Sequence, residues 1–349
     1  LIPHQPGYHM NWMLPHEWVP SHTPYLAISA FLESLSHGDK STVRTLMCYL
    51  AAVLKGMGSL QKFLEIIGTP GTGKSTFVKL GCDLVGSSNL MTTSLDMLQN
   101  NQFETANLFG KRLAVITDAD KYGGSVEVFK SATGQDALRY EKKNQQQGQS
   151  FIYQGMIIVA ANQAVQYRDQ STAMMRRRVP VHIDHRLKEK DRDPNLFKKM
   201  RLELPGLLHD LVMLENQYII EVLNDASGDR ELVRFRSLVE TNPIANWMNE
   251  NLVVCTGYKA KVGSCRRDGS KILNDDEWLY PNYVLAMETS GHRGGVALNS
   301  FKRTVVEIAH EVELECNAGR NSGGSYIEGL RLREETDDDP TLITRENTQ

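Results

Sequence analysis

Apolar residues recur at intervals of three and four in two stretches near the start of the chain, residues 28–35 and 43–54. This spacing places the apolar side chains on one face of an α-helix. Between residues 62 and about 185, short apolar runs alternate with helical or loop segments. Such alternation is typical of an α/β domain built around a mostly parallel sheet. We therefore expect an N-terminal helical collar followed by an α/β core.

The pattern changes after this core. Residues 207–223 again have helical periodicity, and the pair Asn242-Pro243 is typical of a helix start, with Asn as the N-cap and Pro in the first turn. Residues 298–312 predict a further helix and residues 325–332 predict a strand. We expect these last elements to form a small, separate α+β domain of the winged-helix type.

These patterns divide the chain into four predicted parts. They are the collar at residues 1–55, the core with its helical return at residues 56–225, the winged-helix-like domain at residues 226–335 and the tail at residues 336–349. The tail is acidic and has no periodicity, so we expect no packed structure in it.

The composition is that of an ordinary globular protein, with 41% hydrophobic and 23% charged residues. The net charge of −3 means that any binding to nucleic acid must rely on a local basic patch. Five cysteines without a C-x-x-C pair argue against a zinc site or a disulfide framework and favour a reducing, cytoplasmic compartment. No apolar run approaches the ~20 residues of a membrane span, and the first residues do not resemble a signal peptide. We expect a fragment of a longer protein that contacts no membrane.

The strongest local motif is GTPGTGKS at residues 68–75, which fits G-x-x-x-x-G-K-[ST] at every fixed position. It lies between an apolar run and a helical pattern, as a phosphate-binding loop requires. Gly71 and Gly73 let the backbone N–H groups face phosphate oxygens, and the helix start adds its positive end. We expect Lys74 to reach the β- and γ-phosphates of ATP and Ser75 to bind Mg²⁺. The residues expected to bind ATP are Gly68, Thr69, Pro70, Gly71, Thr72, Gly73, Lys74, Ser75 and Thr76.

An apolar strand pattern at residues 111–117 ends in two acids, Asp118 and Asp120. A carboxylate at the end of the strand beside a phosphate loop is where Mg²⁺ and the attacking water need negative charge. We expect Asp118 to be the main acid and, with Ser75, a metal ligand, while Asp120 supports it. The alternative is a strand that ends in an ordinary polar turn.

Two further polar groups lie beside apolar strand patterns. Asn162 ends one such pattern, where its neutral amide could hold the lytic water or touch the γ-phosphate, although Asn at a strand end is often only a turn residue. Arg177 and Arg178 precede another. An arginine there can reach the γ-phosphate bound to a neighbouring subunit, and we expect this of Arg177 before Arg178. Solvated surface arginines are the alternative.

A β-hairpin is predicted for residues 137–154, which alternate in polarity on both sides of a polar, glycine-containing turn. Its cations Arg139, Lys142 and Lys143 could contact DNA phosphates without reading the base sequence. The alternative is a solvated loop without a partner.

In this order, the motifs resemble the superfamily 3 helicases of the AAA+ class, specifically the poxvirus-type and the phage and plasmid primase-helicases. The matching segments are GTPGTGKS (Walker A), LAVITDAD (Walker B), FKSATGQDALRYEKK (the basic motif), IIVAANQ (the sensor strand) and STAMMRRRVPVHI (the arginine motif). The resemblance runs from residue 1 to about 225 and continues more weakly to about 333. The chain departs from the family at Asp118, where the family usually carries Glu, and at Val165, where it often carries Pro. Whether Asp118 or Asp120 is the main acid stays open.

The resemblance implies an AAA+ ATPase that unwinds DNA, moving on single-stranded or forked DNA during replication of a virus, phage or mobile element. It also implies a homo-oligomeric ring, expected to be a hexamer, with Arg177 acting across the subunit interface, and movement in the 3′→5′ direction. The basic motif also contains Lys130, and the resemblance implies that Lys130 binds DNA together with Arg139, Lys142 and Lys143 of the hairpin. Any primase activity would lie upstream of Leu1.

Two functions of other classes remain open on the sequence alone. One is an ATP-dependent loader or switch that assembles on DNA without unwinding it. The other is a nucleotide-regulated scaffold for mobile-element integration or defence. The C-terminal domain is equally open, because its basic loop could contact DNA while the domain could instead pack on the ring or on a protein partner. That loop carries Lys259, Lys261, Arg266, Arg267 and Lys271.

Overall fold

The computed structural model describes residues 12–117, 119, 122, 124–140, 149–165, 173–186, 193–225, 229–291 and 295–337. The chain forms two compact units. The first comprises residues 1–169 and 176–225, and the second comprises residues 170–175 and 226–349.

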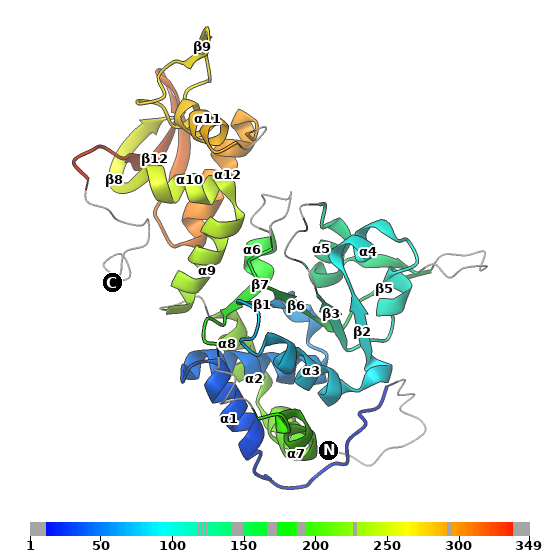
Figure 1. Ribbon diagram of the computed structural model, residues 1–349. Helices are drawn as coiled ribbons and strands as arrows, with labels where there is room; N and C mark the ends of the chain where they lie inside the picture. The colour runs from blue at the N-terminus through cyan, green and yellow to red at the C-terminus, as the bar shows by residue number, and fades with distance from the viewer. Residues whose placement is uncertain are drawn as a thin grey trace. The chain divides into compact units, whose positions relative to one another are not determined.

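The first unit is built on a five-stranded sheet in the order β2-β3-β6-β1-β7, in which all neighbouring strands are parallel (Figure 1). Its strands are β1 (Phe63–Ile67), β2 (Leu90–Thr93), β3 (Leu113–Ile116), β6 (Met156–Ala161) and β7 (Arg178–His182). Every residue of β1 is buried, as expected for a central strand of a sheet covered on both faces. The predicted α/β core with a parallel sheet is confirmed.

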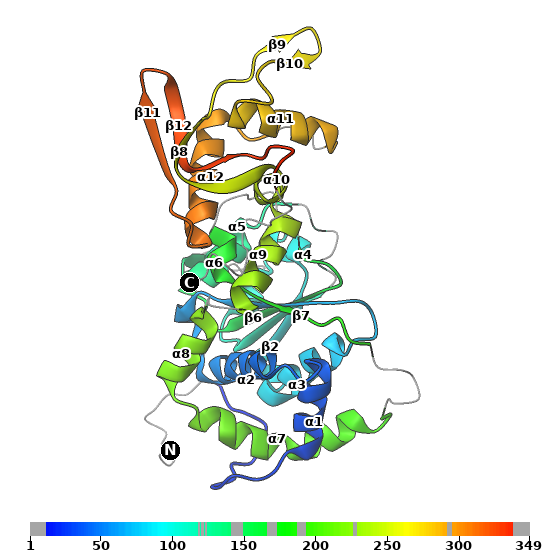
Figure 2. The same cartoon turned by 90° about the vertical axis from the view of Figure 1, so that its left-hand side faces the viewer.

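Helices and short turns connect these strands. The α-helices up to residue 225 are α1 (Leu26–Leu35), α2 (Lys40–Lys55), α3 (Lys74–Val85), α4 (Leu95–Asn100), α5 (Glu127–Gly134), α6 (Ala173–Arg177), α7 (Leu196–Met213) and α8 (Asn216–Asn224), and the first three residues of α6 are counted with the second unit. The 3₁₀ turns are η2 (Gly58–Leu60), η3 (Ser87–Asn89) and η4 (Thr105–Leu108). Figure 2 shows α1, α2, α3 and α7 together on one side of the sheet, and their buried side chains share one apolar core with β1, β3, β6 and β7.

The two predicted N-terminal helices are present as α1 and α2. Asp39 starts α2, because its carboxylate accepts hydrogen bonds from the N–H groups of Ser41 and Thr42 at 2.9 Å. Gly56 ends it in the left-handed conformation, with φ +63°. Both ends of α2 are therefore fixed by local chemistry that the sequence encodes.

The helix predicted through residues 207–223 is instead two helices, α7 and α8. Leu214 and Glu215 adopt extended backbone angles between them, with ψ of 134° and 139°. The ammonium of Lys55, at the end of α2, donates hydrogen bonds to the carbonyl of Leu214 and to the side chain of Asn216, the latter at 3.0 Å. A carbonyl taken by a lysine from another helix no longer needs a partner within its own helix, which stabilises the break.

The predicted hairpin is present as β4 (Ala137–Tyr140) and β5 (Gln149–Ile152), paired antiparallel with Arg139 opposite Ser150. Its tip lies outside the described residues. The hairpin is held to η4 because the hydroxyl of Thr105 donates to the carbonyl of Arg139 at 2.7 Å.

The second unit has an apolar core of its own. Its elements are α9 (Asp229–Thr241), α10 (Pro243–Asn251), β8 (Leu252–Lys261), β9 (Arg267–Asp268), β10 (Lys271–Ile272), α11 (Leu279–Thr289), α12 (Leu298–Glu311), β11 (Asn317–Asn321) and β12 (Gly324–Leu332). An antiparallel sheet of order β11-β12-β8 packs with these helices around Trp247, Tyr283 and Phe301. Asn242 caps α10 as predicted, since its Oδ1 accepts from the N–H of Ile244 at 2.9 Å.

Candidate nucleotide-binding site

The GTPGTGKS segment forms a curled loop between β1 and α3. Gly71 and Gly73 have φ of +87° and +99°, a conformation that favours glycine. A Cβ on Gly68 would lie only 2.1 Å from the carbonyl oxygen of Ile183, so only glycine fits where the loop leaves β1. The loop conformation follows directly from its three glycines.

Lys74 is the first residue of α3, and its ammonium lies inside this loop. It donates hydrogen bonds to the carbonyls of Gly68 and Thr69, the latter at 3.0 Å. It also donates to Oδ1 of Asn162 at 3.2 Å. The side chain is only 8% exposed. A buried cation at a helix N-terminus is a strong local attraction for an anion.

Asn162 reaches Lys74 because of the sheet topology. It follows β6 directly, and β6 lies beside β1 in parallel register, with Ala161 opposite Ile67. The carboxyl ends of these two strands therefore meet at the same edge of the sheet, where the phosphate loop begins. Two residues that lie 88 positions apart in the sequence become hydrogen-bonded neighbours.

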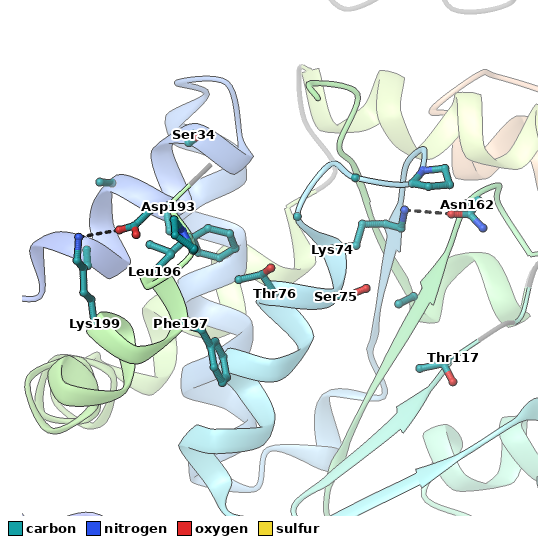
Figure 3. A pocket seen from close by; sticks show the side chains of 18 of the residues that line it. Ser34, Lys74, Ser75, Thr76, Thr117, Asn162, Asp193, Leu196, Phe197 and Lys199 are labelled. Carbon is teal, nitrogen blue, oxygen red and sulfur yellow. Dashed lines mark hydrogen bonds and ion pairs between the residues drawn. The ribbon is translucent and has the colours of Figure 1, made fainter. Parts of the chain in front are cut away.

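A cavity of about 950 Å³ opens beside this loop (Figure 3). One end is polar and includes Lys74, Ser75, Thr117 and Asn162. The other end is formed by two helices and is mostly apolar. Its lining residues are Ala27, Ala30, Phe31 and Ser34 of α1 and Leu196, Phe197 and Lys199 at the start of α7, with Asp193 and Pro194 before it.

The helical end of the cavity was not predicted from the sequence. Residues 27–34 and 193–199 each resemble ordinary amphipathic helix segments, and no local motif indicates that the chain brings them together. Asp193 and Lys199 form an exposed ion pair at 2.7 Å at this end (Figure 3). The hydrogen bonds from Lys199 and from the N–H of Asn195 hold the pKa of Asp193 below its usual value.

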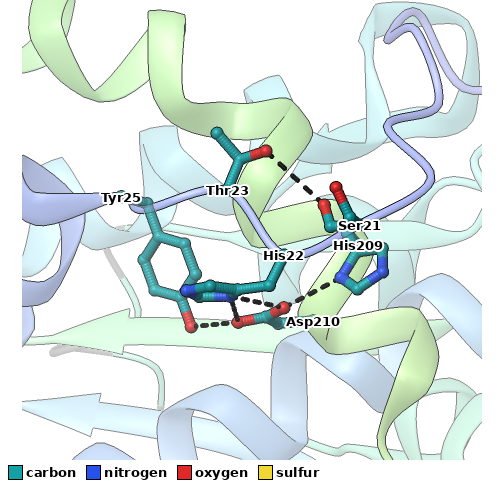
Figure 4. Close-up of polar contacts among 6 residues, drawn as sticks. All are labelled: Ser21, His22, Thr23, Tyr25, His209 and Asp210. Atoms are coloured by element: carbon teal, nitrogen blue, oxygen red, sulfur yellow. Dashed lines mark hydrogen bonds and ion pairs between the residues drawn. The ribbon is translucent and has the colours of Figure 1, made fainter.

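Side chains behind the cavity hold α1 and α7 together. The carboxylate of Glu203, on α7, accepts hydrogen bonds from the N–H groups of Ala27 and Ile28 at 3.0 Å, which satisfies two donors in the first turn of α1. Asp210, about two turns further along α7, accepts hydrogen bonds from His22, Tyr25 and His209 at 2.9 to 3.0 Å (Figure 4).

This cluster changes the titration of Asp210 and Tyr25. Partial burial alone raises the pKa of Asp210, but the hydrogen bonds from His209, His22 and Tyr25 outweigh it and the pKa lies below its ordinary value. Burial, together with the hydrogen bond to Asp210, raises the pKa of Tyr25 to about 12. At neutral pH the aspartate is therefore charged and the tyrosine is a hydrogen-bond donor.

Some of the other predicted site residues are among the described residues, and some are not. Thr117 lines the cavity, so the chain enters the predicted acid segment there, but Asp118 and Asp120 themselves lie outside the described residues. Lys142 and Lys143, at the hairpin tip, also lie outside them. Arg139 is exposed on β4, and Lys130 is half-buried on α5.

The three arginines differ in their surroundings. Arg176 is exposed, whereas Arg177 and Arg178 are 8% and 6% exposed. The guanidinium of Arg177 packs against Gly134, where a Cβ would meet its Nη2 at 2.8 Å. Arg178 forms an ion pair with the buried Glu65 at 2.9 Å. Arg177 and Arg178, which the sequence analysis expected to reach a neighbouring subunit, thus make contacts within their own chain.

The described residues can also be searched for metal-binding clusters and for membrane-spanning helices. Within the described residues, no group of three or more His, Cys, Asp or Glu side chains is gathered as a metal site would need. The exposed hydroxyl of Ser75 at the cavity is the kind of ligand that accompanies Mg²⁺ on a nucleotide. No helix in the described part of the chain combines the length and the apolar character that a membrane crossing requires.

Comparisons with known proteins agree with this architecture. Residues 66–178 match DUF5906, a family of unknown function. The matched stretch contains the phosphate loop, Asn162 and the arginine triplet. The fold is similar to two structures of the NrS-1 C-terminal region without ligand. One has a TM-score of 0.52 and 13% identity and covers 90% of this chain and 76% of that one. The other, of residues 305–718, has a TM-score of 0.51 and 14% identity and covers 91% and 78%.

Proposed function

We propose that the chain is an ATP-hydrolysing motor of the superfamily 3 helicase type, which moves along single-stranded DNA during replication of a virus, phage or mobile element. The observation that carries this proposal is the position of Lys74. Its ammonium lies inside the glycine loop, 3.2 Å from Oδ1 of Asn162, at one end of a nucleotide-sized cavity. A triphosphate needs this combination of a cation, backbone N–H donors and a neutral amide at its terminal phosphates.

Each group would have a separate task. The loop N–H groups and Lys74 would bind the β- and γ-phosphates, and Asn162 would orient the γ-phosphate or the attacking water. Ser75, with Asp118, would hold Mg²⁺, which would neutralise charge on the phosphates when bound. The apolar end of the cavity would take the base, between Phe31 of α1 and Phe197 of α7.

The order of the strands supports the AAA+ assignment. The strand that precedes the phosphate loop, β1, lies between β6 and β7, and β6 separates it from β3. Asn162, directly after β6, therefore lies between the loop and the C-terminal end of β3. This is the arrangement that the resemblance implies for a sensor residue, which must touch both the phosphate and the water.

The C-terminal unit supports a nucleic-acid role less directly. After α9, its elements follow the order α10-β8-β9-β10-α11-α12-β11-β12, in which β9 and β10 are strands of two residues each, and β12 lies between β8 and β11 in the sheet. We propose that the unit is winged-helix-like, as expected from the sequence, and this order of helices and strands supports the proposal. Lys302 and Arg303 on α12 and the exposed Arg320 on β11 would be available to a DNA backbone.

The decisive experiment measures ATP hydrolysis by protein whose size has been determined by light scattering, with and without single-stranded DNA, together with strand displacement on a forked duplex. We expect a ring-sized oligomer, faster hydrolysis when DNA is present, and displacement that requires ATP. A monomer whose ATP hydrolysis is indifferent to DNA would contradict the proposal.

A second candidate is an ATP-dependent switch that assembles on DNA without unwinding it. The inward packing of Arg177 and Arg178 favours it, because a switch need not borrow an arginine from its neighbour. It would hydrolyse ATP and bind DNA in the same experiment but displace no strand.

A further inference from the structure

Glu65 is a buried carboxylate in the middle of β1, an interior strand of the sheet. Its neighbours in the strand are Phe63, Leu64, Ile66 and Ile67, and its own side chain is 0% exposed. Burying a charge is costly unless it is paired and hydrogen-bonded. An acid in this position therefore needs a specific partner.

Both carboxylate oxygens of Glu65 have such partners. Oε1 accepts a hydrogen bond from the backbone N–H of Val165 at 2.9 Å, and Oε2 forms the ion pair with Nε of Arg178 at 2.9 Å. Arg178, the first residue of β7, then donates from Nη2 to the carbonyl of Val165 at 3.0 Å. The N–H and the C=O of a single residue are held by the two members of one buried ion pair.

Val165 belongs to the loop that carries Asn162. The loop leaves β6 at Ala161, and Val165 follows Asn162 by three residues. Val165 is 0% exposed, so water does not compete for these hydrogen bonds. Asn162, by contrast, is an exposed side chain, and its Oδ1 accepts a hydrogen bond from Lys74. The ion pair is therefore well placed to fix the backbone from which Asn162 projects.

We propose that Glu65 and Arg178 are positioning residues that clamp Val165 and so hold Asn162 against Lys74 and the terminal phosphate. This inference rests on the proposed function, and it assigns Arg178 to the site of its own subunit. A displacement of about 1 Å at a catalytic group can lower turnover by about 10²-fold. We expect loss of the clamp to lower kcat for ATP hydrolysis while nucleotide affinity, which depends on the loop and the base end, changes little.

The test combines the double variant Glu65→Leu with Arg178→Met and the variant Asn162→Ala. Replacing both charges avoids leaving one of them buried and unpaired, so the fold is expected to survive. In the wild-type background, the double variant should lower kcat by about 10–100-fold and change the dissociation constant of ATP by less than about threefold. In the Asn162→Ala background it should lower kcat by less than about twofold, because the clamp acts only through Asn162.

Equal losses of kcat in both backgrounds would overturn the inference. Val179→Ala is the matched control, since Val179 is a buried neighbour of Arg178 on β7 without a contact to Val165 among those described. Val179→Ala should lower the free energy of unfolding yet leave kcat nearly unchanged.

If the double variant does not fold, Arg178→Lys takes its place, because lysine keeps the charge but cannot bridge Glu65 and the carbonyl of Val165 as a guanidinium does. A kcat for Arg178→Lys equal to that of the wild type would also overturn the inference that Arg178 positions Asn162. Absence of ATP hydrolysis in the wild type would instead contradict the proposed function.

Discussion

At the scale of the residue, Lys74 is the most consequential side chain. It is a nearly buried cation held by loop carbonyls and by Asn162, at the positive end of α3. A terminal phosphate entering the loop would exchange these contacts for stronger, charge-assisted ones. The residue is therefore expected to contribute to the chemical step as well as to binding.

We predict that Lys74→Ala lowers ATP turnover by at least about 10²–10³-fold, the usual effect of removing one group that stabilises transition-state charge. Circular dichroism should show an unchanged fold, because the alanine sits at a helix start. Steady-state phosphate release measures the effect. A purified Lys74→Ala protein that still turns over ATP would disprove the assignment of the phosphate loop.

Because the pKa of Asp210 is lowered in the folded chain, we predict that the free energy of unfolding depends on pH. Its pKa is lower in the folded chain than the unfolded value of about 4, so its stabilising contribution is complete above about pH 4 and is lost as the pH falls through the lowered value. Asp210→Asn should cost about 1 kcal/mol of unfolding free energy near neutral pH, and the difference from wild type should shrink below about pH 4. Urea unfolding at several pH values measures this. Glu33→Gln, an exposed carboxyl on α1, is the control, and a pH-independent difference for Asp210→Asn would contradict the prediction.

The sequence predicted those features of the site that depend on residues adjacent in the chain. The glycine loop around Lys74 follows from local backbone freedom, and the strand ends before Asn162 and Thr117 follow from short apolar runs. The surroundings of the arginines could not be predicted in this way. Three consecutive basic residues look alike in a sequence, and only the packing of β7 against β1 separates the exposed Arg176 from Arg178, which is paired with Glu65.

At the scale of the element, α1 and α7 together line the helical end of the cavity, where we propose that the base binds. The two helices are distant in the sequence and are joined by Glu203, which caps α1 from α7. The helices themselves were predictable from periodicity, at least in part, but their pairing was not. It depends on hydrogen bonds between one side chain and a distant helix start, which leave no regular spacing in the chain.

We predict that Phe197→Ala raises the dissociation constant of ATP by about tenfold, because base–aromatic contacts contribute about 1–3 kcal/mol. Inorganic triphosphate, which has no base, should bind with unchanged affinity. Leu202→Ala is the control, since Leu202 lies on the same helix and is 79% exposed. Equal weakening of both ligands by Phe197→Ala would exclude the helical end of the cavity as the base site.

At the scale of the whole molecule, the proposed motor requires that one subunit completes the site of another. The clamp proposal gives the arginines different roles. Arg178 would serve the site of its own chain, while the finger role would fall to Arg177, as the sequence indicated, or to the exposed Arg176.

Mixing experiments separate these roles. Subunits with Lys74→Ala, mixed with subunits with Arg177→Ala or Arg176→Ala, should regain part of the ATPase activity if that arginine acts in trans, because some interfaces then join an intact lysine to an intact arginine. The mixture of Lys74→Ala with the Glu65→Leu and Arg178→Met double variant should show no activity beyond the residual turnover of the double variant, since each chain is damaged at its own site. Recovery in the double-variant mixture would contradict the clamp, and no recovery in either of the others would exclude an arginine finger among these residues.

The first turn of α7 lines the helical end of the cavity, and α7 and α8 are the last helices of the first unit. From Leu196 the backbone runs through α7 and α8 to Asp225, and the second unit resumes at the next residue. Under the proposed function, α7 and α8 form a covalent route from the nucleotide site to the C-terminal unit.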